Sequence, residues 1–445
     1  MNKRKLNILL LSGVNPLDNA GISVYDMFRS LQQAGHSVLL LTKDYDDRFE
    51  PGMESVCGKK NWIYPVCQIF SGNFPYKLFR KIQSLLKGKI KMDLSYYMYS
   101  LDERKNHIST PILTSHIQKK IDAIIYCFPH FFLDSKNIYE LNQITQAPVF
   151  VIPPDMSSFT GGCHYANDCR RFEHTCGKCP GLYSKDERDI TYRNLMYKKR
   201  YISKTNICIL GNKWTIDLSK KSFLYKDKPN SLINFVINEN HYKLTGKDDA
   251  RYYFSIPTDK KIIFFGAAFI DEKRKGFSFL LDALNILYKE LPEMERTKIG
   301  IAIAGNLNED IRHLFQFDTY ILGYLSNEQL PKAYQSADVF VSPSIQDAGP
   351  MMVIQSMMCG TPVVAFEMGN AIDYIIDGVT GFKVPLCDII SLKDKILRVL
   401  KSSNEKKAQM SINCRKIAKE KSSYKAFERD FFSNYQSIVK YKTNF

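Results

Sequence analysis

The chain lacks any run of eighteen or more apolar residues, so its sequence predicts no membrane-spanning helix. It also lacks internal repeats, low-complexity tracts and any recognisable nucleic-acid-binding module, and we therefore expect no nucleic-acid partner. Acidic residues are few: 46 Asp and Glu stand against 62 Lys and Arg, which gives a formal net charge of +16. This imbalance favours an anionic partner, such as a nucleotide-linked substrate, a polyanionic acceptor or an acidic membrane surface.

The length of 445 residues exceeds what one hydrophobic core organises, so two or three domains are expected. With 44% apolar and 24% charged residues, the composition is that of a globular protein. The beginning, MNKRKLNILLLSGV, has a short apolar run without a following small-residue cleavage site, and it predicts a first β-strand rather than a signal peptide. Eleven cysteines, an odd number in a chain with a large core, predict reduced thiols in a cytoplasm.

Residues 338–383 predict a strand, a loop, a short helix and a second strand. Pro350 suits the first position of the helix, and Gly360 suits the left-handed position that ends it. The free N–H groups at the helix start face the loop, so an anion can bind there. Asp347 precedes this helix and can address a sugar near phosphates, whereas Gln355 lies within it and can bond to a ribose. The alternative is a plain βαβ unit without a ligand.

These positions resemble the donor-binding signature of bacterial family-four (group 1) retaining glycosyltransferases, which have the GT-B fold. That signature has two acidic residues eight positions apart, followed by Cys-Gly-x-Pro-Val-Val; here Asp347 and Gln355 have this spacing and CGTPVVAF follows. The shorter Asp and the uncharged Gln depart from the usual Glu at both positions. The resemblance implies that the N–H groups of Gly349, Met351 and Met352 face the donor diphosphate. The donor-binding residues that it implies here are Asp347, Ala348, Gly349, Pro350, Met351, Met352 and Gln355.

A basic loop follows the strand expected at residues 261–266. Family members use a Lys before a Gly here, and an Arg just after the strand, to bind the donor pyrophosphate. Lys275 followed by Gly276 matches the first feature, whereas Ala267 stands where the Arg is usual and leaves Arg274 as a candidate substitute. Without the downstream signature, the same residues would be an ordinary solvated loop.

Two other loops match the family in part. Gly21 follows the first strand, where the family's Gly-rich turn approaches the donor phosphates and the acceptor, but this chain has one Gly in place of the usual pair. A tight turn before a helix explains Gly21 equally well. The loop that the resemblance assigns to the nucleotide base contains Gly323, Tyr324 and Leu325.

Four cysteines in a short segment suit a metal site. They are separated by five, six and two residues, and the final Cys-Gly-Lys-Cys is a compact thiolate pair of the kind zinc selects. We expect a structural zinc, with free thiols, disulfides or another metal as alternatives, and with His164 and His174 as spare ligands. The cysteines are Cys163, Cys169, Cys176 and Cys179.

The same segment closely resembles a Thr-Gly-Gly-Cys-His-Tyr…Cys-Gly-x-Cys-Pro insert found in one branch of the family. In that branch a His-Asp pair stands just upstream; here Pro154 and Asp155 occupy those positions, so the Asp is kept and the His is missing. His130, after the strand expected at residues 121–127, is a displaced candidate for a His that family members carry near this point.

An insertion at residues 43–120 interrupts the alternation of strands and helices. Within it, residues 76–92 predict an amphipathic helix with basic residues beside its apolar face. Such a helix can lie on an anionic bilayer, or it can cover a protein core with its lysines solvated.

The resemblance covers nearly the whole chain outside this insertion, and it implies an α/β protein with two Rossmann-like parallel-sheet domains facing across a cleft. We predict an acceptor-side domain at 1–237 that includes the Cys-rich segment 155–183, a nucleotide-sugar domain at 238–423, and a terminal helix at 424–445 that crosses back.

The implied activity is transfer of a sugar, with retention, from a nucleotide-diphosphate sugar to a glycan or lipid-linked acceptor in bacterial surface polysaccharide synthesis. It would occur in the cytoplasm, with peripheral contact to the inner face of the plasma membrane and without a catalytic cofactor. The candidate catalytic residues are Asp347, Lys275, Asp155 and His130. The alternatives are another enzyme on this scaffold, such as an epimerase or phosphorylase, and an inactive donor-binding or partner subunit.

Overall fold

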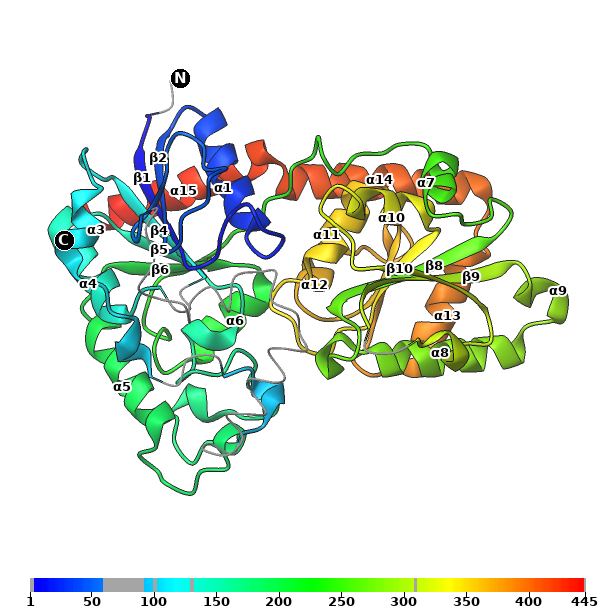
Figure 1. Ribbon diagram of the computed structural model, residues 1–445, viewed down its shortest axis with the longest axis horizontal. Helices are drawn as coiled ribbons and strands as arrows, with labels where there is room; N and C mark the ends of the chain where they lie inside the picture. Colours follow the sequence, from blue (N-terminus) through cyan, green and yellow to red (C-terminus); the bar gives the residue numbers. More distant parts are fainter. Residues whose placement is uncertain (1–3, 59–91, 99–101, 129–131, 308–309, 444–445) are drawn as a thin grey trace. The chain divides into compact units, whose positions relative to one another are not determined.

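The computed structural model describes residues 4–58, 92–98, 102–128, 132–307 and 310–443 (Figure 1). The chain divides into two compact units, each of which is described by itself. Unit 1 consists of Met1–Gly211, Thr215–Ile233 and Phe427–Phe445, and unit 2 consists of Asn212–Trp214 and Asn234–Ala426. The boundary after Ile233 falls earlier in the chain than the predicted one at residue 237.

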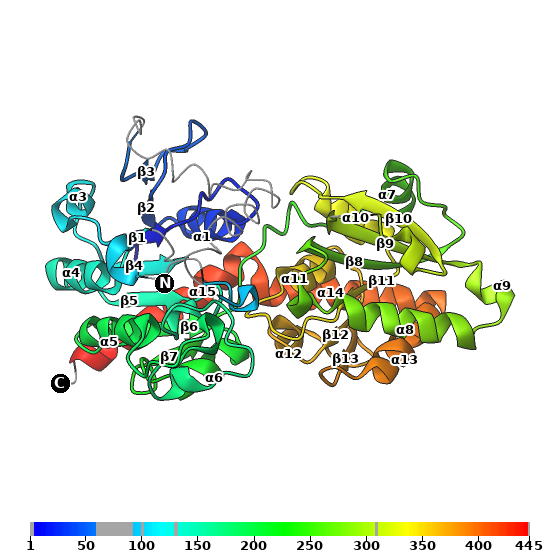
Figure 2. The ribbon, with the colours of Figure 1, turned by 60° about the horizontal axis from the view of Figure 1, so that its bottom comes forward.

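Unit 1 contains a seven-stranded parallel sheet in the order β3-β2-β1-β4-β5-β6-β7, which the labels in Figure 2 follow from top to bottom. Strands β4, β5 and β6 are buried along their whole length, as expected where helices cover both faces of a parallel sheet. The strands are β1 (Asn7–Ser12), β2 (Ser37–Thr42), β3 (Met53–Ser55), β4 (Ala123–Cys127), β5 (Val149–Ile152), β6 (Ile207–Gly211) and β7 (Asn230–Leu232).

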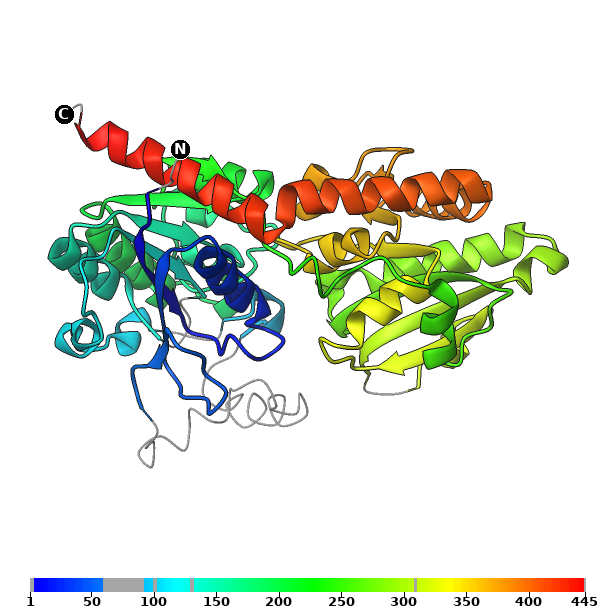
Figure 3. The ribbon, with the colours of Figure 1, turned by 90° about the horizontal axis from the view of Figure 1, so that it is seen from above.

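Aromatic contacts join the last helix of the chain to this sheet. The ring of Phe431 meets that of Phe150 on β5 edge to face, with 5.3 Å between centroids. Figure 3 shows this helix, α15, running along unit 1. The helices that contribute to unit 1 are α1 (Ile22–Gln33), α3 (Thr110–Ser115), α4 (Ser135–Thr145), α5 (Ile190–Ile202), α6 (Lys213–Lys221) and α15 (Tyr424–Thr443).

Unit 2 contains a six-stranded parallel sheet in the order β10-β9-β8-β11-β12-β13. Figure 1 shows α8 and α13 on one side of this sheet and α7, α10 and α14 on the other. Its strands are β8 (Lys261–Phe269), β9 (Ile299–Asn306), β10 (Asp318–Gly323), β11 (Val339–Ser342), β12 (Val363–Phe366) and β13 (Gly381–Val384). Its helices are α7 (Lys247–Tyr253), α8 (Phe277–Glu290), α9 (Glu293–Arg296), α10 (Leu330–Ser336), α11 (Met351–Met358), α12 (Asn370–Tyr374), α13 (Ile389–Leu400) and α14 (Asn404–Ser422).

The strand orders fix where each unit can hold a ligand. In unit 1 the chain winds outward in both directions from β1 and β4, and in unit 2 from β8 and β11. Open parallel sheets bind ligands beyond the carboxyl ends of the strands at such a reversal point. The prediction of two Rossmann-like parallel sheets is confirmed.

Two predictions bear on membranes. Among the described helices, none combines the length and the apolar character needed to cross a bilayer. The amphipathic helix expected at residues 76–92 lies outside the described residues, except for Met92.

Candidate functional site

Two loops meet at the reversal point of unit 2. Residues 343–350 follow β11, and a short 3₁₀ turn at Lys273–Lys275 follows β8, the strand that pairs with β11. The Ile345 N–H donates a hydrogen bond of 2.9 Å to the carbonyl of Arg274, which joins the two loops. The predicted strand, loop, helix and strand of residues 338–383 are therefore present, and the basic loop lies against them.

Gly276 permits this close approach. Its φ is +74°, and a Cβ at this position would lie 1.8 Å from the carbonyl oxygen of Pro343. A residue with a side chain would therefore push the basic turn away from the loop that contains Asp347. The Lys275-Gly276 pair combines a cation with the one residue type that lets the cation reach its partner.

Asp347 binds both cations of the turn. Lys275 Nζ forms an ion pair with its Oδ2, and Arg274 Nη1 approaches the same oxygen at 3.2 Å. The Asp347 side chain is 7% exposed, and those of Arg274 and Lys275 are 16% and 21% exposed. Burial raises the pKa of this carboxyl, but Lys275 and Arg274 outweigh it and hold the pKa below its usual value. The candidate substitute Arg274 thus lies beside Lys275 and Asp347.

The start of α11 adds N–H donors to this loop. Pro350 is the residue just before the helix, not its first residue as predicted, and Met351 begins it. The side chain of Met352 leaves no room for a Cβ on Gly266 of β8, which would lie 2.5 Å from its Cε. Gly349 likewise faces the ring of Phe235, where a Cβ would lie 2.4 Å away. Small residues therefore let the helix start lie close to the strand ends.

Asn212, which no sequence pattern marks as a site residue, is hydrogen-bonded to the same loop. Asn212 donates hydrogen bonds from Nδ2 to the carbonyl of Ala348 at 2.5 Å and to Oδ1 of Asn370 at 2.9 Å. It follows β6 in the chain but belongs to unit 2. Because it lies more than a hundred residues from Ala348 in sequence, no local pattern could have revealed this contact.

Gln355 is buried, with 6% exposure, and its Oε1 accepts a 2.8 Å hydrogen bond from the hydroxyl of Tyr334. The predicted base loop ends β10, two strands away from β8. Within it, Gly323 has a φ of +71°, Tyr324 is 51% exposed and Leu325 is buried. Tyr324 is thus the exposed aromatic residue of this loop.

The remaining candidate residues belong to unit 1. Gly21 caps α1, and a Cβ there would lie 1.9 Å from the Asn15 carbonyl oxygen, which accounts for the Gly as a packing requirement. Asp155 is buried, and its Oδ2 accepts a 2.8 Å hydrogen bond from Nδ1 of His164. Sequence reasoning considered His164 only as a spare metal ligand and missed this pair. His130 lies outside the described residues.

The four cysteines of the Cys-rich segment line one pocket. Burial raises the pKa of Cys163 and of Cys179, and it raises that of Cys176 to about 12. At Cys179 the N–H groups of Leu182 and Gly181 offset part of this rise in the pKa. All the described cysteines are free thiols. Among the described residues, no three Cys, His, Asp or Glu side chains form a ready metal-binding group.

Comparison with known proteins relates unit 2 to one family. Residues 247–417 match the family model of group 1 glycosyl transferases. An uncharacterised glycosyltransferase of Methanocaldococcus jannaschii is 26% identical over 223 residues, which cover 47% of this chain and 53% of that protein. The phosphatidyl-myo-inositol mannosyltransferase of Mycobacterium leprae is 31% identical over 151 residues, covering 32% of this chain and 38% of that protein. The chain thus spans about half or less of these relatives.

Solved structures extend the similarity of fold to nearly the whole chain. Sucrose-phosphate synthase from Thermosynechococcus elongatus has a TM-score of 0.64 at 16% identity, covering 98% of this chain and 100% of that one. The Anabaena protein HepE in complex with UDP and glucose has a TM-score of 0.59 at 14% identity, covering 97% and 100%. At these identities the likeness is one of fold.

Proposed function

We propose, from the group 1 glycosyltransferase domain at residues 247–417, that the chain transfers a sugar from a nucleotide-diphosphate sugar to an acceptor. The observation that carries the proposal is the Arg274, Lys275 and Asp347 cluster at the reversal point of the unit that matches this family. It pairs two cations with the start of a helix, and both features favour a diphosphate.

The chemistry follows from where charge develops. When the bond between the anomeric carbon and the phosphate oxygen breaks, negative charge builds on the leaving diphosphate. Lys275, Arg274 and the N–H groups at the start of α11 would stabilise that charge, and fixed donors of this kind supply a large share of catalysis. Asp347 would orient the sugar, and Gln355 would contact the ribose. We propose retention of the anomeric configuration and no catalytic cofactor.

We further propose a glycan or lipid-linked acceptor in bacterial surface polysaccharide synthesis. A phosphatidyl-myo-inositol mannosyltransferase is among the relatives of this chain, and the net charge of +16 suits an anionic membrane surface. Peripheral contact at the cytoplasmic face of the plasma membrane is testable by co-sedimentation with anionic vesicles. Leu78, Phe79 and Ile82 changed to Ser should weaken that binding; unchanged binding would remove residues 76–92 from the proposal.

A structural zinc at the four cysteines is a separate proposal. It is supported by their spacing and by the single pocket that they line. Because the thiols are not gathered into a ready metal-binding group, zinc would have to draw them together and deprotonate them.

The experiment for the main proposal measures the binding of a panel of nucleotide-sugars to the protein. Binding is measured by thermal shift and by calorimetry. We expect selective binding of one donor, and loss of that binding in Lys275→Ala. Lys273→Ala is the matched control because Lys273 is an exposed lysine of the same turn outside the Asp347 cluster. No binding by any donor, or equal binding by Lys275→Ala and wild type, would reject the assignment of this site.

The second candidate is an inactive donor-binding or partner subunit. It is favoured by the departures from the usual Glu at two positions, the shorter Asp347 and the uncharged Gln355, and by the hydrogen bond that engages the Gln355 oxygen with Tyr334. This candidate predicts the same donor binding without turnover, so only a measurement of product separates the two.

A further inference from the structure

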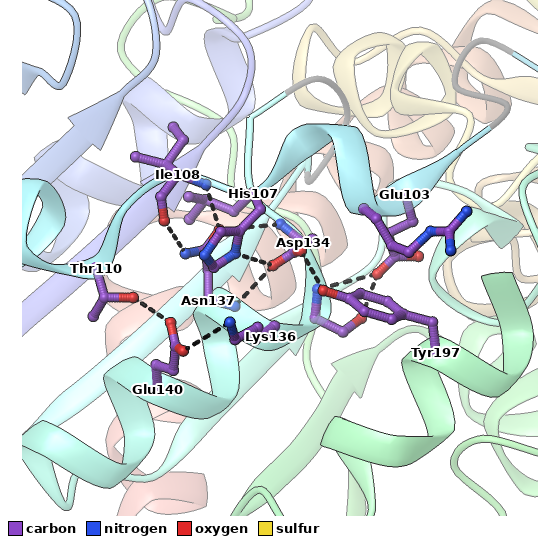
Figure 4. Close-up of polar contacts among 12 residues, drawn as sticks. Glu103, His107, Ile108, Thr110, Asp134, Lys136, Asn137, Glu140 and Tyr197 are labelled. Carbon is purple, nitrogen blue, oxygen red and sulfur yellow. Dashed lines mark hydrogen bonds and ion pairs between the residues drawn. The ribbon is translucent and has the colours of Figure 1, made fainter.

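Some buried carboxylates of this chain are explained by the backbone that they bind. In Figure 4, Asp134 of unit 1 accepts a hydrogen bond of 2.9 Å from the N–H of Asn137 at the start of α4. His107 and Tyr197 are also bonded to it, at 3.2 and 2.7 Å. A carboxylate at this position caps a helix, so its burial needs no ligand to explain it. Glu272 of unit 2 caps no N–H group of the turn that it precedes.

Glu272 lies just before the 3₁₀ turn Lys273–Lys275 of the proposed donor site, and its side chain is 8% exposed. Its backbone carbonyl accepts a 2.8 Å hydrogen bond from the N–H of Lys275, which closes the turn. Its carboxylate accepts a 2.7 Å hydrogen bond from Nε of Arg274. Within the described part of the chain, Arg274 is the one side chain that this carboxylate binds.

The contact between Glu272 and Arg274 depends on the local backbone. Side chains two residues apart do not face each other on a regular helix. Glu272 lies outside such geometry, because its backbone is extended, with a φ of −72° and a ψ of 106°. The extended residue allows its carboxylate to lie beside Arg274, so the fold of the turn itself builds this pair.

Arg274 is held along its whole length. Its backbone carbonyl accepts a 2.9 Å hydrogen bond from the N–H of Ile345, its Nε donates to Glu272, and its Nη1 lies 3.2 Å from Oδ2 of Asp347. A guanidinium is planar and carries its N–H groups in a fixed fork, so holding Nε and Nη1 fixes the plane of the group. Lys275, in contrast, reaches Asp347 with a compact charge on a flexible stem. Arg274 is therefore the preorganised cation of the turn.

The charge of Glu272 does not favour a diphosphate. Glu272 and Asp347 balance the charges of Arg274 and Lys275, so the cluster as a whole is neutral. A carboxylate near a diphosphate repels it. If this cluster binds a diphosphate, the contribution of Glu272 must therefore come from the position that it gives to Arg274.

We propose that Glu272 is a positioning residue for the donor diphosphate. It holds the guanidinium of Arg274 in the orientation in which Arg274 binds a phosphate oxygen. Ordering a long side chain during binding costs affinity, and a residue that orders it beforehand saves that cost. Glu272 acts through Arg274 and does not itself touch the donor. This inference rests on the proposed function, since it concerns the same diphosphate site.

Two conservative variants separate the effect of position from that of charge. Glu272→Asp keeps the charge but shortens the side chain by one C–C bond, about 1.5 Å, so the carboxylate no longer reaches Nε of Arg274. Glu272→Gln removes the charge but keeps an oxygen that can accept the same hydrogen bond. We expect Glu272→Asp to weaken the binding of a nucleoside diphosphate about fivefold, because Arg274 must then be ordered during binding. Glu272→Gln should bind at least as tightly as wild type.

The assay titrates UDP, GDP and ADP into the protein by calorimetry, and the nucleotide that wild type binds most tightly is used for every variant. The matched control is Glu290→Asp, because Glu290 pairs with Lys393 at 2.6 Å at the other end of α8, about 20 Å along the helix from the turn. It should leave the dissociation constant unchanged. In an Arg274→Met background, Glu272→Asp should cause no further weakening, because the side chain that it positions is gone. Thermal melting checks that each variant is folded.

Equal binding by Glu272→Asp and wild type would overturn the inference, and so would a loss in Glu272→Asp that persists in the Arg274→Met background. Weaker binding by Glu272→Gln than by Glu272→Asp would show that the charge matters instead of the position, and would also overturn it. Binding by wild type that is lost in Lys275→Ala supports the proposed donor site independently of Glu272. If wild type binds none of the nucleotides, the proposed function and this inference are rejected together.

Discussion

Replacing Asp347 by Asn should strengthen the binding of a nucleoside diphosphate, although the replaced residue lies inside the proposed donor site. In the structure Asp347 neutralises Lys275 and Arg274, the two cations assigned to the diphosphate. A diphosphate must therefore share these cations with a carboxylate that repels it. Asn keeps the shape and the carbonyl oxygen of the side chain but removes its charge.

The size of the effect follows from Coulomb's law. A phosphate charge about 6 Å from the Asp347 carboxylate is repelled by about 2–3 kcal/mol at an effective dielectric constant of about 20. After screening by solvent, we expect the dissociation constant of UDP to fall at least about tenfold in Asp347→Asn. The same change leaves two neighbouring cations without their anion, so the variant should lose about 3 kcal/mol of unfolding free energy.

The assay is calorimetric titration of UDP into wild type, Asp347→Asn, Lys275→Ala and Lys273→Ala. It measures the expected increase and the expected decrease in UDP affinity in one series. Binding should be tighter in Asp347→Asn, weaker in Lys275→Ala and unchanged in the Lys273→Ala control. If Asp347→Asn weakens UDP binding as much as Lys275→Ala does, the carboxylate supports the cations instead of competing for them, and the reasoning fails.

Three further predictions concern the loop, the thiols and the effect of pH. Gly276→Ala should reduce both donor binding and thermal stability, because a Cβ there collides with backbone at a φ of +74°; a variant that keeps wild-type donor affinity would show that the close approach is unnecessary. Elemental analysis should find about one zinc per chain, lost when Cys176 and Cys179 are both changed to Ser, whereas a metal-free wild type would reject the zinc site. The pKa of Asp347 is lowered on folding, so its stabilisation is complete above the ordinary value of about 3.9 and is lost as the pH falls through the lower folded value. In urea unfolding, the free energy of unfolding of wild type should therefore exceed that of Asp347→Asn by a constant amount between pH 7 and about 5. This difference should shrink below about pH 4, and a difference that grows on acidification would contradict the lowered pKa of Asp347.

Local patterns were enough to predict the two sheets and the strand, loop, helix and strand around Asp347. Short-range sequence patterns are sufficient to predict these features. Examples are the apolar runs that form β8 and β11, and the Gly276 that follows Lys275. Contacts between residues far apart in the sequence cannot be predicted from such local patterns. Asn212 reaches Ala348 only because the chain after β6 joins unit 2.

The pair formed by Asp155 and His164 in unit 1 shows the same limit of sequence analysis. The sequence marked Asp155 as the remainder of a His-Asp pair but could not identify His164 as its partner, because a loop of irregular backbone brings the two together.

The most direct test of the central claim is the release of nucleoside diphosphate from the donor that the binding panel selects, with and without extracted glycolipid acceptors. We predict slow release by the full-length chain alone, faster release with acceptor, and neither in Lys275→Ala. Tight donor binding without any release, even in the presence of acceptors, would contradict the transferase and identify a donor-binding subunit instead.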